Sequence, residues 1–152
     1  MPVEIQITEP FQPQIDSALV QIAAQAALHH QGAAENAVLS IVITGNEQLQ
    51  QLNKQFRDLD APTDVLSFPA DYVDPENQAP YLGDLLISCP QAESQALAAG
   101  HDLMAEIQLL VVHGILHLLG HDHAGADQKA RMWTAQAEIL GVLGLGDISV
   151  PS

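Results

Sequence analysis

Residues 103–123 limit the folds open to this chain more than any other stretch of the sequence. The segment from Leu103 to Val112 is almost entirely apolar and contains neither Gly nor Pro, so we expect a buried α-helix there. That helix runs into a histidine-rich segment at residues 113–123, which reads His-Gly-Ile-Leu-His-Leu-Leu-Gly-His-Asp-His. We expect the rest of the chain to be organised around this element.

The histidine spacing predicts a metal site. His113 and His117 are four residues apart, which on a helix places their Cβ atoms about 5–6 Å from each other. Both imidazoles can then reach one zinc ion at about 2.0–2.1 Å. Gly120 favours the left-handed conformation that ends helices, so the chain can turn and bring His123 to the same ion. Three histidine ligands leave one position of a tetrahedral Zn²⁺ open, which is typical of catalytic rather than structural sites. Imidazole also suits nickel, copper and iron.

The pattern H-x-x-x-H-x-x-G-x-x-H is similar to that of the metzincin metalloproteases. Those enzymes carry a Glu directly after the first His, and this Glu acts as the general base. Here that position is Gly114. We therefore expect the metal scaffold without the base that peptide hydrolysis uses.

Length and composition indicate one folded domain over residues 1–152. The hydrophobic fraction of 47% is typical of a globular chain, and no apolar run is long enough to span a bilayer. The N-terminus has no basic region followed by an apolar one, so we expect no signal peptide. Cys89 is the single cysteine, which fits a reducing compartment. We predict a cytoplasmic location and no membrane association.

The charge balance is strongly acidic. The net charge is −15, with 19 acidic residues against four basic ones: Lys54, Arg57, Lys129 and Arg131. This argues against broad electrostatic binding of nucleic acid, which depends on Lys and Arg. A bound divalent metal and protonated histidines would make one cleft locally positive.

The remaining patterns predict an α+β fold with a small mixed sheet of about four strands packed with helices. We expect an acidic connecting loop over residues 70–80. Strands are predicted over residues 3–8, 37–44, 65–68 and 85–89, and helices over 13–30 and 90–99, after Asn46, from Asp102 to Gly120 and after Asp127.

Two residues have open interpretations. Arg57 either forms an ordinary ion pair with a nearby aspartate or clamps a phosphate, because a guanidinium offers a planar fork to phosphate oxygens. Asp84 is either a partner of a metal-bound histidine or a turn residue. The aspartates within reach of Arg57 in the sequence are Asp58, Asp60 and Asp64.

The chain resembles the YbeY family, bacterial endoribonucleases also called rRNA maturation factors. The resemblance covers about residues 37–145 in unbroken order. It is carried by Phe-Arg at 56–57, Pro-Thr-Asp-Val-Leu-Ser-Phe-Pro at 62–69, Gly-Asp-Leu-Leu-Ile-Ser at 83–88, the histidine segment at 113–123, Met132 and Glu138.

The resemblance implies that His113, His117 and His123 bind zinc and that Arg57 acts on the substrate phosphate. It implies cleavage of single-stranded RNA in ribosomal RNA maturation, including the 3′ end of 16S rRNA, and in ribosome quality control. The ribosome, ribosomal proteins or a basic partner would then supply affinity that this acidic chain lacks. His121 departs from the family pattern, in which a Tyr is usual.

These observations leave the general base and the nucleophile open. Asp64, Asp84 and Asp122 are candidate bases, and either a metal-bound water or the 2′-hydroxyl of the RNA can attack. Two other functions remain as alternatives. The chain would be a zinc peptidase of unusual type, or a non-catalytic module that uses zinc for stability and docks on the ribosome or a partner.

Overall fold

The computed structural model describes residues 2–73, 75–76, 78–122 and 124–148. The strands in these ranges are β1 (Val3–Ile7), β2 (Val38–Thr44), β3 (Val65–Val73) and β4 (Pro80–Ser88). The helices are the 3₁₀ helix η1 (Glu9–Gln14) and the α-helices α1 (Ser17–His30), α2 (Asn46–Arg57), α3 (Cys89–Ala99), α4 (Leu103–Leu118) and α5 (Ala126–Val142).

The described strands form one mixed sheet in the order β1-β2-β4-β3. β1, β2 and β4 are parallel to one another, and β3 pairs antiparallel with β4 at the edge. This four-stranded sheet with helices packed on it confirms the predicted α+β class. The central position of β2 agrees with its nearly continuous apolar sequence, which is typical of a strand covered on both faces.

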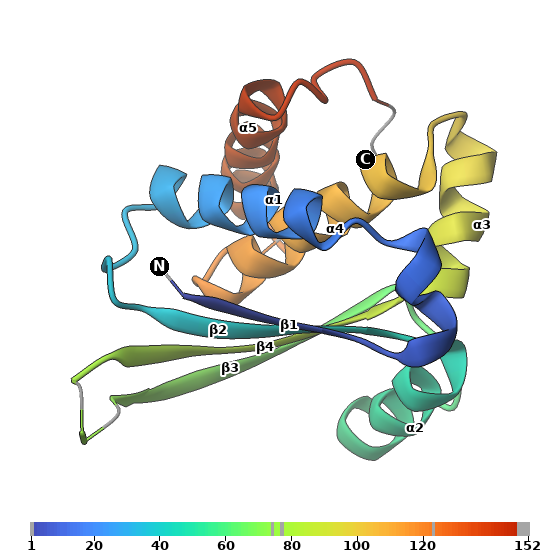
Figure 1. Cartoon of the computed structure of the whole chain (residues 1–152). Helices are drawn as coiled ribbons and strands as arrows, with labels where there is room; N and C mark the ends of the chain where they lie inside the picture. The colour runs from blue at the N-terminus through green and yellow to red at the C-terminus, as the bar shows by residue number, and fades with distance from the viewer. Residues whose placement is uncertain (1, 74, 77, 123, 149–152) are drawn as a thin grey trace.

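Helices cover the two faces of the sheet unequally. Figure 1 shows α1, α4 and α5 on one face and α2 on the other. On the first face, fully buried side chains of β2 and β4, such as Ile41 and Leu85, pack against α4 in the main core. On the second face, Leu49 of α2 packs with Leu66 and Leu86 in a smaller cluster. The predicted buried helix is therefore the one that lies across the main core.

Both ends of α4 follow from local sequence. Asp102 caps its N-terminus, where the side chain accepts a hydrogen bond from the backbone N–H of Ala105 at 2.8 Å. At the other end Gly120 has φ +99°, and the N–H of His121 donates to the carbonyl of Leu116 at 2.9 Å. This is a Schellman ending, as the Gly predicted. The chain therefore leaves the helix axis shortly after His117.

Several elements have other bounds than the sequence predicted. Helices α2 and α5 begin at Asn46 and Ala126, and not after Asn46 and after Asp127. The acidic segment is not a connecting loop along its whole length, because β3 continues to Val73 and β4 begins at Pro80. Tyr72 pairs with Tyr81 across this hairpin, and their rings stack with centroids 5.3 Å apart. The first long helix begins at Ser17 instead of residue 13, since the preceding prolines lie in η1.

Among the described residues we find no helix whose length and apolar character would let it cross a membrane.

Candidate metal centre

The structure brings two of the three predicted metal ligands together. His113 and His117 lie on one face of α4, with ring centroids 4.8 Å apart and ring planes at 74°. Both side chains are half-buried, at the point where α4 approaches the end of its apolar run. The four-residue spacing therefore places the two imidazoles side by side, as expected from helix geometry.

A glutamine from α5 orients His113. The Nδ1 atom of His113 lies 2.9 Å from the Oε1 atom of Gln136, whose residue is only 2% exposed. An amide oxygen accepts hydrogen bonds, so Nδ1 carries the proton and donates it. In this tautomer Nε2 is the ring nitrogen without a proton, as a metal ligand requires. Trp133, also on α5, packs its ring against that of His113 with centroids 5.8 Å apart.

Sequence reasoning missed Gln136. It follows Met132 by four residues and precedes Leu140 by four, so it occupies a core position of α5. A polar side chain on the buried stripe of a helix needs a partner. That partner is His113, 23 residues earlier in the chain.

Gln136→Met is expected to weaken metal binding about 10–100-fold, because it removes the acceptor that fixes the His113 tautomer while keeping the side-chain volume. Titration against a chromophoric chelator measures the affinity. Gln136→Glu is the matched control, since its carboxylate still accepts from Nδ1, and it should bind metal at least as well as wild type. Equal affinities for the Met variant and the wild type would contradict this role.

The third predicted ligand, His123, lies outside the described residues. The described residues themselves contain no cluster of three or more His, Cys, Asp or Glu side chains arranged to hold a metal. The zinc site therefore stays a prediction. The described residues are compatible with a zinc site. Two imidazoles are adjacent, Gln136 sets the tautomer of one of them, and the chain turns at Gly120 after the helix that carries both.

Gly114 lies against the sheet. A Cβ atom built there would be 2.7 Å from Cδ2 of Leu85 and 3.4 Å from Cγ2 of Val65. The Gly114 carbonyl also accepts a hydrogen bond from the hydroxyl of Ser67 at 3.3 Å. The position that holds the general base in the metzincin pattern is thus used here for close packing of α4 on β3 and β4.

Gly114→Ala is expected to lower the free energy of unfolding by about 1–3 kcal/mol, the usual effect of overpacking, because Leu85 is fully buried. Urea unfolding measures the change. Gly141→Ala is the matched control, because nothing lies within 4 Å of its Cβ in α5, and it should stabilise by up to about 1 kcal/mol. A stable Gly114→Ala variant would mean that α4 can move away from the sheet.

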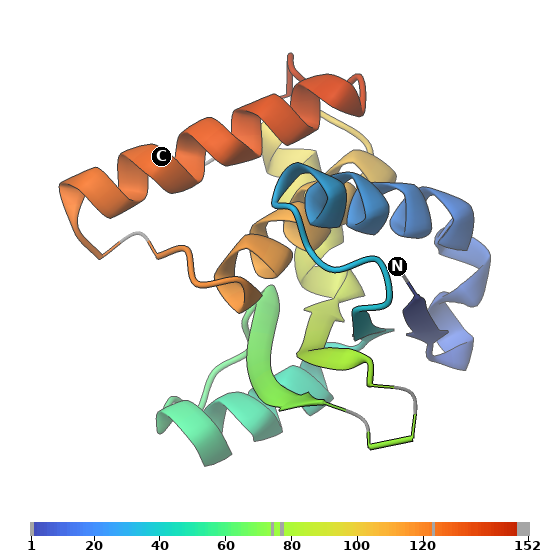
Figure 2. The same ribbon diagram turned by 90° about the vertical axis from the view of Figure 1, so that its left-hand side faces the viewer.

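Arg57 ends α2, on the opposite face of the sheet from α4, and its side chain is exposed. Among the described residues it forms no ion pair, so the simple ion-pair interpretation is wrong. Asp60 instead lies 3.9 Å from Lys54. Figure 2 shows the end of α2 and the segment between α4 and α5 on the same side of the molecule, at the left. The structure gives no direct contact between Arg57 and the two described histidines.

The candidate bases are dispersed. Asp84 is a strand residue and not a turn residue. It is paired with Phe68 on the α2 face of the sheet, and its carboxylate accepts from the hydroxyl of Tyr81 at 2.5 Å. Asp64 accepts from the N–H of Val65 at 2.8 Å. These contacts give neither carboxylate a link to His113.

The side chain of His121 forms a hydrogen bond within the protein. Its Nε2 atom lies 2.8 Å from Oε1 of Gln31, which follows the end of α1. The side chain therefore ties the segment after α4 to α1.

A buried pair lies nearer the start of α4. Glu106 is 3% exposed, and its Oε1 atom lies 2.6 Å from Nε2 of His101. Burial raises the pKa of Glu106, and the hydrogen bond from His101 lowers it in part. This contact is a structural hydrogen bond that fixes the entry to α4.

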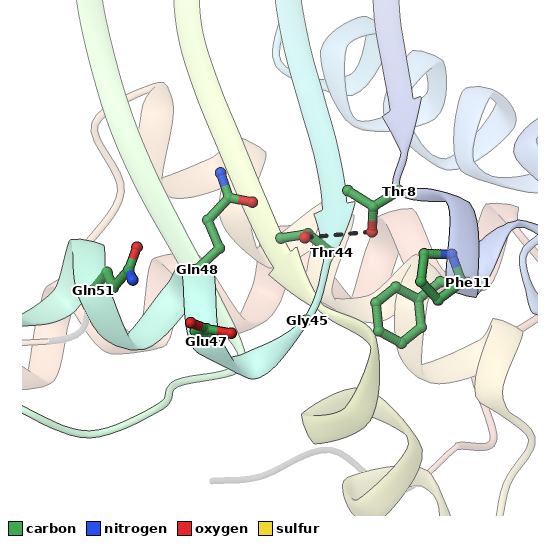
Figure 3. A pocket seen from close by; sticks show the side chains of 8 residues that line it. Thr8, Phe11, Thr44, Gly45, Glu47, Gln48 and Gln51 are labelled. Atoms are coloured by element: carbon green, nitrogen blue, oxygen red, sulfur yellow. Dashed lines mark hydrogen bonds between the residues drawn. The ribbon is translucent and has the colours of Figure 1, made fainter.

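A separate surface pocket of about 460 Å³ opens where β1 and β2 end and α2 begins (Figure 3). The hydroxyl of Thr8 donates to that of Thr44 across its floor at 3.4 Å, and Phe11 forms one wall. None of the predicted site residues lines this pocket.

Comparisons with known proteins agree on one family. Residues 4–144 match the family model described as Endoribonuclease YbeY. A protein of that name from Roseiflexus sp. (strain RS-1) is 43% identical over 149 residues, covering 94% of this chain and 93% of its own. Another from Dehalococcoides mccartyi (strain CBDB1) is 40% identical over 148 residues, covering 90% and 89%. The solution structure of TM1509 from Thermotoga maritima is similar with a TM-score of 0.57 at 23% identity, covering 99% of this chain and 98% of that one, and it supports the fold alone.

Proposed function

The chain belongs to the YbeY family of endoribonucleases, which are RNA-cleaving hydrolases, and on that premise we propose how and where it acts. We propose that it cleaves single-stranded RNA at a Zn²⁺ ion held by His113, His117 and His123. The observation that carries the proposal is the pair of adjacent imidazoles on α4, one of them oriented by the buried Gln136.

The chain's own residues have distinct tasks in this proposal. When bound, the metal would supply Lewis-acid chemistry and lower the pKa of a coordinated water. Gln136 accepts a hydrogen bond from Nδ1 of His113, which would leave the other ring nitrogen, Nε2, as the metal ligand. Arg57, exposed and without an ion pair among the described residues, would donate to phosphate oxygens as charge develops on them.

The substrate we propose is precursor ribosomal RNA, with maturation of the 16S 3′ end in the cytoplasm as the setting. The net charge of −15 opposes unaided binding of a polyanion. We therefore propose that the ribosome, a ribosomal protein or another basic partner presents the RNA to the domain formed by residues 1–152.

The two alternatives fit the observations less well. A peptidase of the metzincin type needs a base where Gly114 packs on Leu85, and this position has no room for one. A non-catalytic module disagrees with the names of the relatives, which are endoribonucleases.

The test is cleavage of a labelled single-stranded rRNA precursor fragment by purified protein of measured zinc content. We expect cutting that stops with a chelator and returns when zinc is added. A 2′,3′-cyclic phosphate on the product would identify the 2′-hydroxyl as the nucleophile, and a linear phosphate would identify water. Cleavage that persists in metal-free protein would refute the metal mechanism.

A further inference from the structure

A small pocket lies beside the candidate metal centre, between the end of α4 and the start of α5. We call it the α4–α5 pocket. It has a volume of about 240 Å³, and its wall begins two residues after His117. In Figure 2 this part of the chain forms the left side of the molecule, above β3. The pocket is lined by Leu119, Gly120, His121, Asp122, Gln128 and Arg131.

The wall of this pocket is held in place. Gly120 and His121 belong to the Schellman ending of α4, and the side chain of His121 bonds to Gln31 at 2.8 Å. Opposite them, Gln128 and Arg131 project from the first two turns of α5, one turn apart. The two helices, together with the Schellman ending and the contact of His121 with Gln31, therefore set the shape of the pocket before a ligand arrives.

Arg131 stands out because cations are scarce in this chain. Lys54 lies against Asp60, and the Nζ atom of Lys129 lies 5.6 Å from the centroid of the Trp133 ring. Arg131 has no carboxylate partner among the described residues. Its Nε atom donates to the carbonyl of Asp127 at 3.4 Å, which leaves the two terminal nitrogens of the guanidinium for another acceptor.

The chemistry of the wall selects an anion of low charge. A guanidinium offers two parallel donors to phosphate oxygens, and the amide of Gln128 adds a neutral polar group. The carboxylate of Asp122 in the same wall repels negative charge. A terminal phosphate carries about −1.5 to −2, whereas an internucleotide phosphodiester carries one charge, so the wall favours the diester.

We propose that the α4–α5 pocket binds an internucleotide phosphodiester of the RNA substrate through Arg131, next to the bond that is cleaved. The inference rests on the proposed function, because it takes the histidines on α4 as the place of cleavage. It assigns the second arginine of the chain to binding, separate from the role proposed for Arg57.

The experiment compares Arg131→Gln with wild type in binding a fluorescent single-stranded 2′-O-methyl oligonucleotide over a range of salt concentrations. We expect Kd to rise about tenfold, and the slope of log K against log salt to become shallower by about 0.7, the value of one phosphate contact on a single strand. Lys54→Gln is the matched control. It removes the same charge from α2, and it should leave the slope unchanged.

Competition tests the ligand class. A dinucleoside phosphate should displace the oligonucleotide from wild type at lower concentration than a nucleoside monophosphate does. With Arg131→Gln the two competitors should differ little. A monophosphate that competes better in wild type would overturn the assignment to a diester.

The outcomes separate this inference from the proposed function. If Arg131→Gln binds with the wild-type Kd and slope while RNA cleavage continues, the pocket assignment is wrong and the proposed function stands. If wild type binds through Arg131 but cuts no RNA in the cleavage assay, the pocket assignment stands and the proposed function fails. If wild type binds no single strand at any salt concentration, the pocket assignment fails, and the cleavage assay alone decides the proposed function. Zinc content and melting temperature should be equal in all three proteins, because Arg131 and Lys54 are exposed.

Discussion

His117→Ala is expected to reduce RNA cleavage by roughly a thousandfold or more, since a catalytic metal contributes several kcal/mol to transition-state stabilisation. His117 is the last of the proposed ligands before α4 ends, and its ring lies beside that of His113. Without it the proposed site keeps two ligands at most. Single-turnover cleavage of the rRNA precursor fragment and zinc content per chain measure the loss together.

The control for this variant is His29→Ala. His29 is exposed in the last turn of α1, so it removes one imidazole without touching the candidate site. It should keep wild-type zinc content and cleavage. A ligand that binds only the folded state raises the melting temperature. Chelator should therefore lower the melting temperature of wild type and of His29→Ala, and leave that of His117→Ala unchanged. Undiminished cleavage by zinc-free His117→Ala would show that the reaction needs no metal.

The features that could be predicted from the sequence are those that depend on nearby residues. The His113–His117 pair, the cap at Asp102 and the helix end at Gly120 each involve residues within one or two turns, and each is present in the structure. The four strands were recognisable because their side chains alternate or are continuously apolar. The third ligand, His123, remains a prediction from spacing.

What escaped prediction depends on contacts between distant elements. The hydrogen bond from His113 to Gln136 joins α4 to α5, and no local pattern specifies which helices meet. The packing of Gly114 on Leu85 requires the sheet to be in place. The extension of the β3–β4 hairpin into an acidic segment depends on the stacking of Tyr72 on Tyr81, which offsets the weak strand propensity of its neighbours. In all three cases tertiary structure determines the outcome.

Arg57→Ala is expected to lower the single-turnover cleavage rate by about 10²–10³-fold, the usual effect of removing one donor to a developing oxyanion. The physical reason is that Arg57 is exposed and has no ion pair among the described residues, so its guanidinium can act on the substrate without first breaking a contact in the protein. For the same reason the substitution should change the free energy of unfolding by less than about 0.5 kcal/mol. Zinc content should be unchanged.

Lys54→Ala distinguishes catalysis from simple charge attraction, because Lys54 lies one turn earlier on α2 and its ion pair with Asp60 is long, at 3.9 Å. Loss of a charge that only attracts RNA raises KM, whereas loss of a transition-state contact lowers kcat. We expect Lys54→Ala to leave both KM and kcat close to the wild-type values and Arg57→Ala to lower kcat. Arg57→Lys should recover only a small part of the rate, since an ammonium cannot offer the planar fork of a guanidinium. If both alanine variants raise KM equally and leave kcat intact, Arg57 attracts RNA and takes no part in the reaction. A non-catalytic module would give the same zinc content with no cleavage in any variant, wild type included.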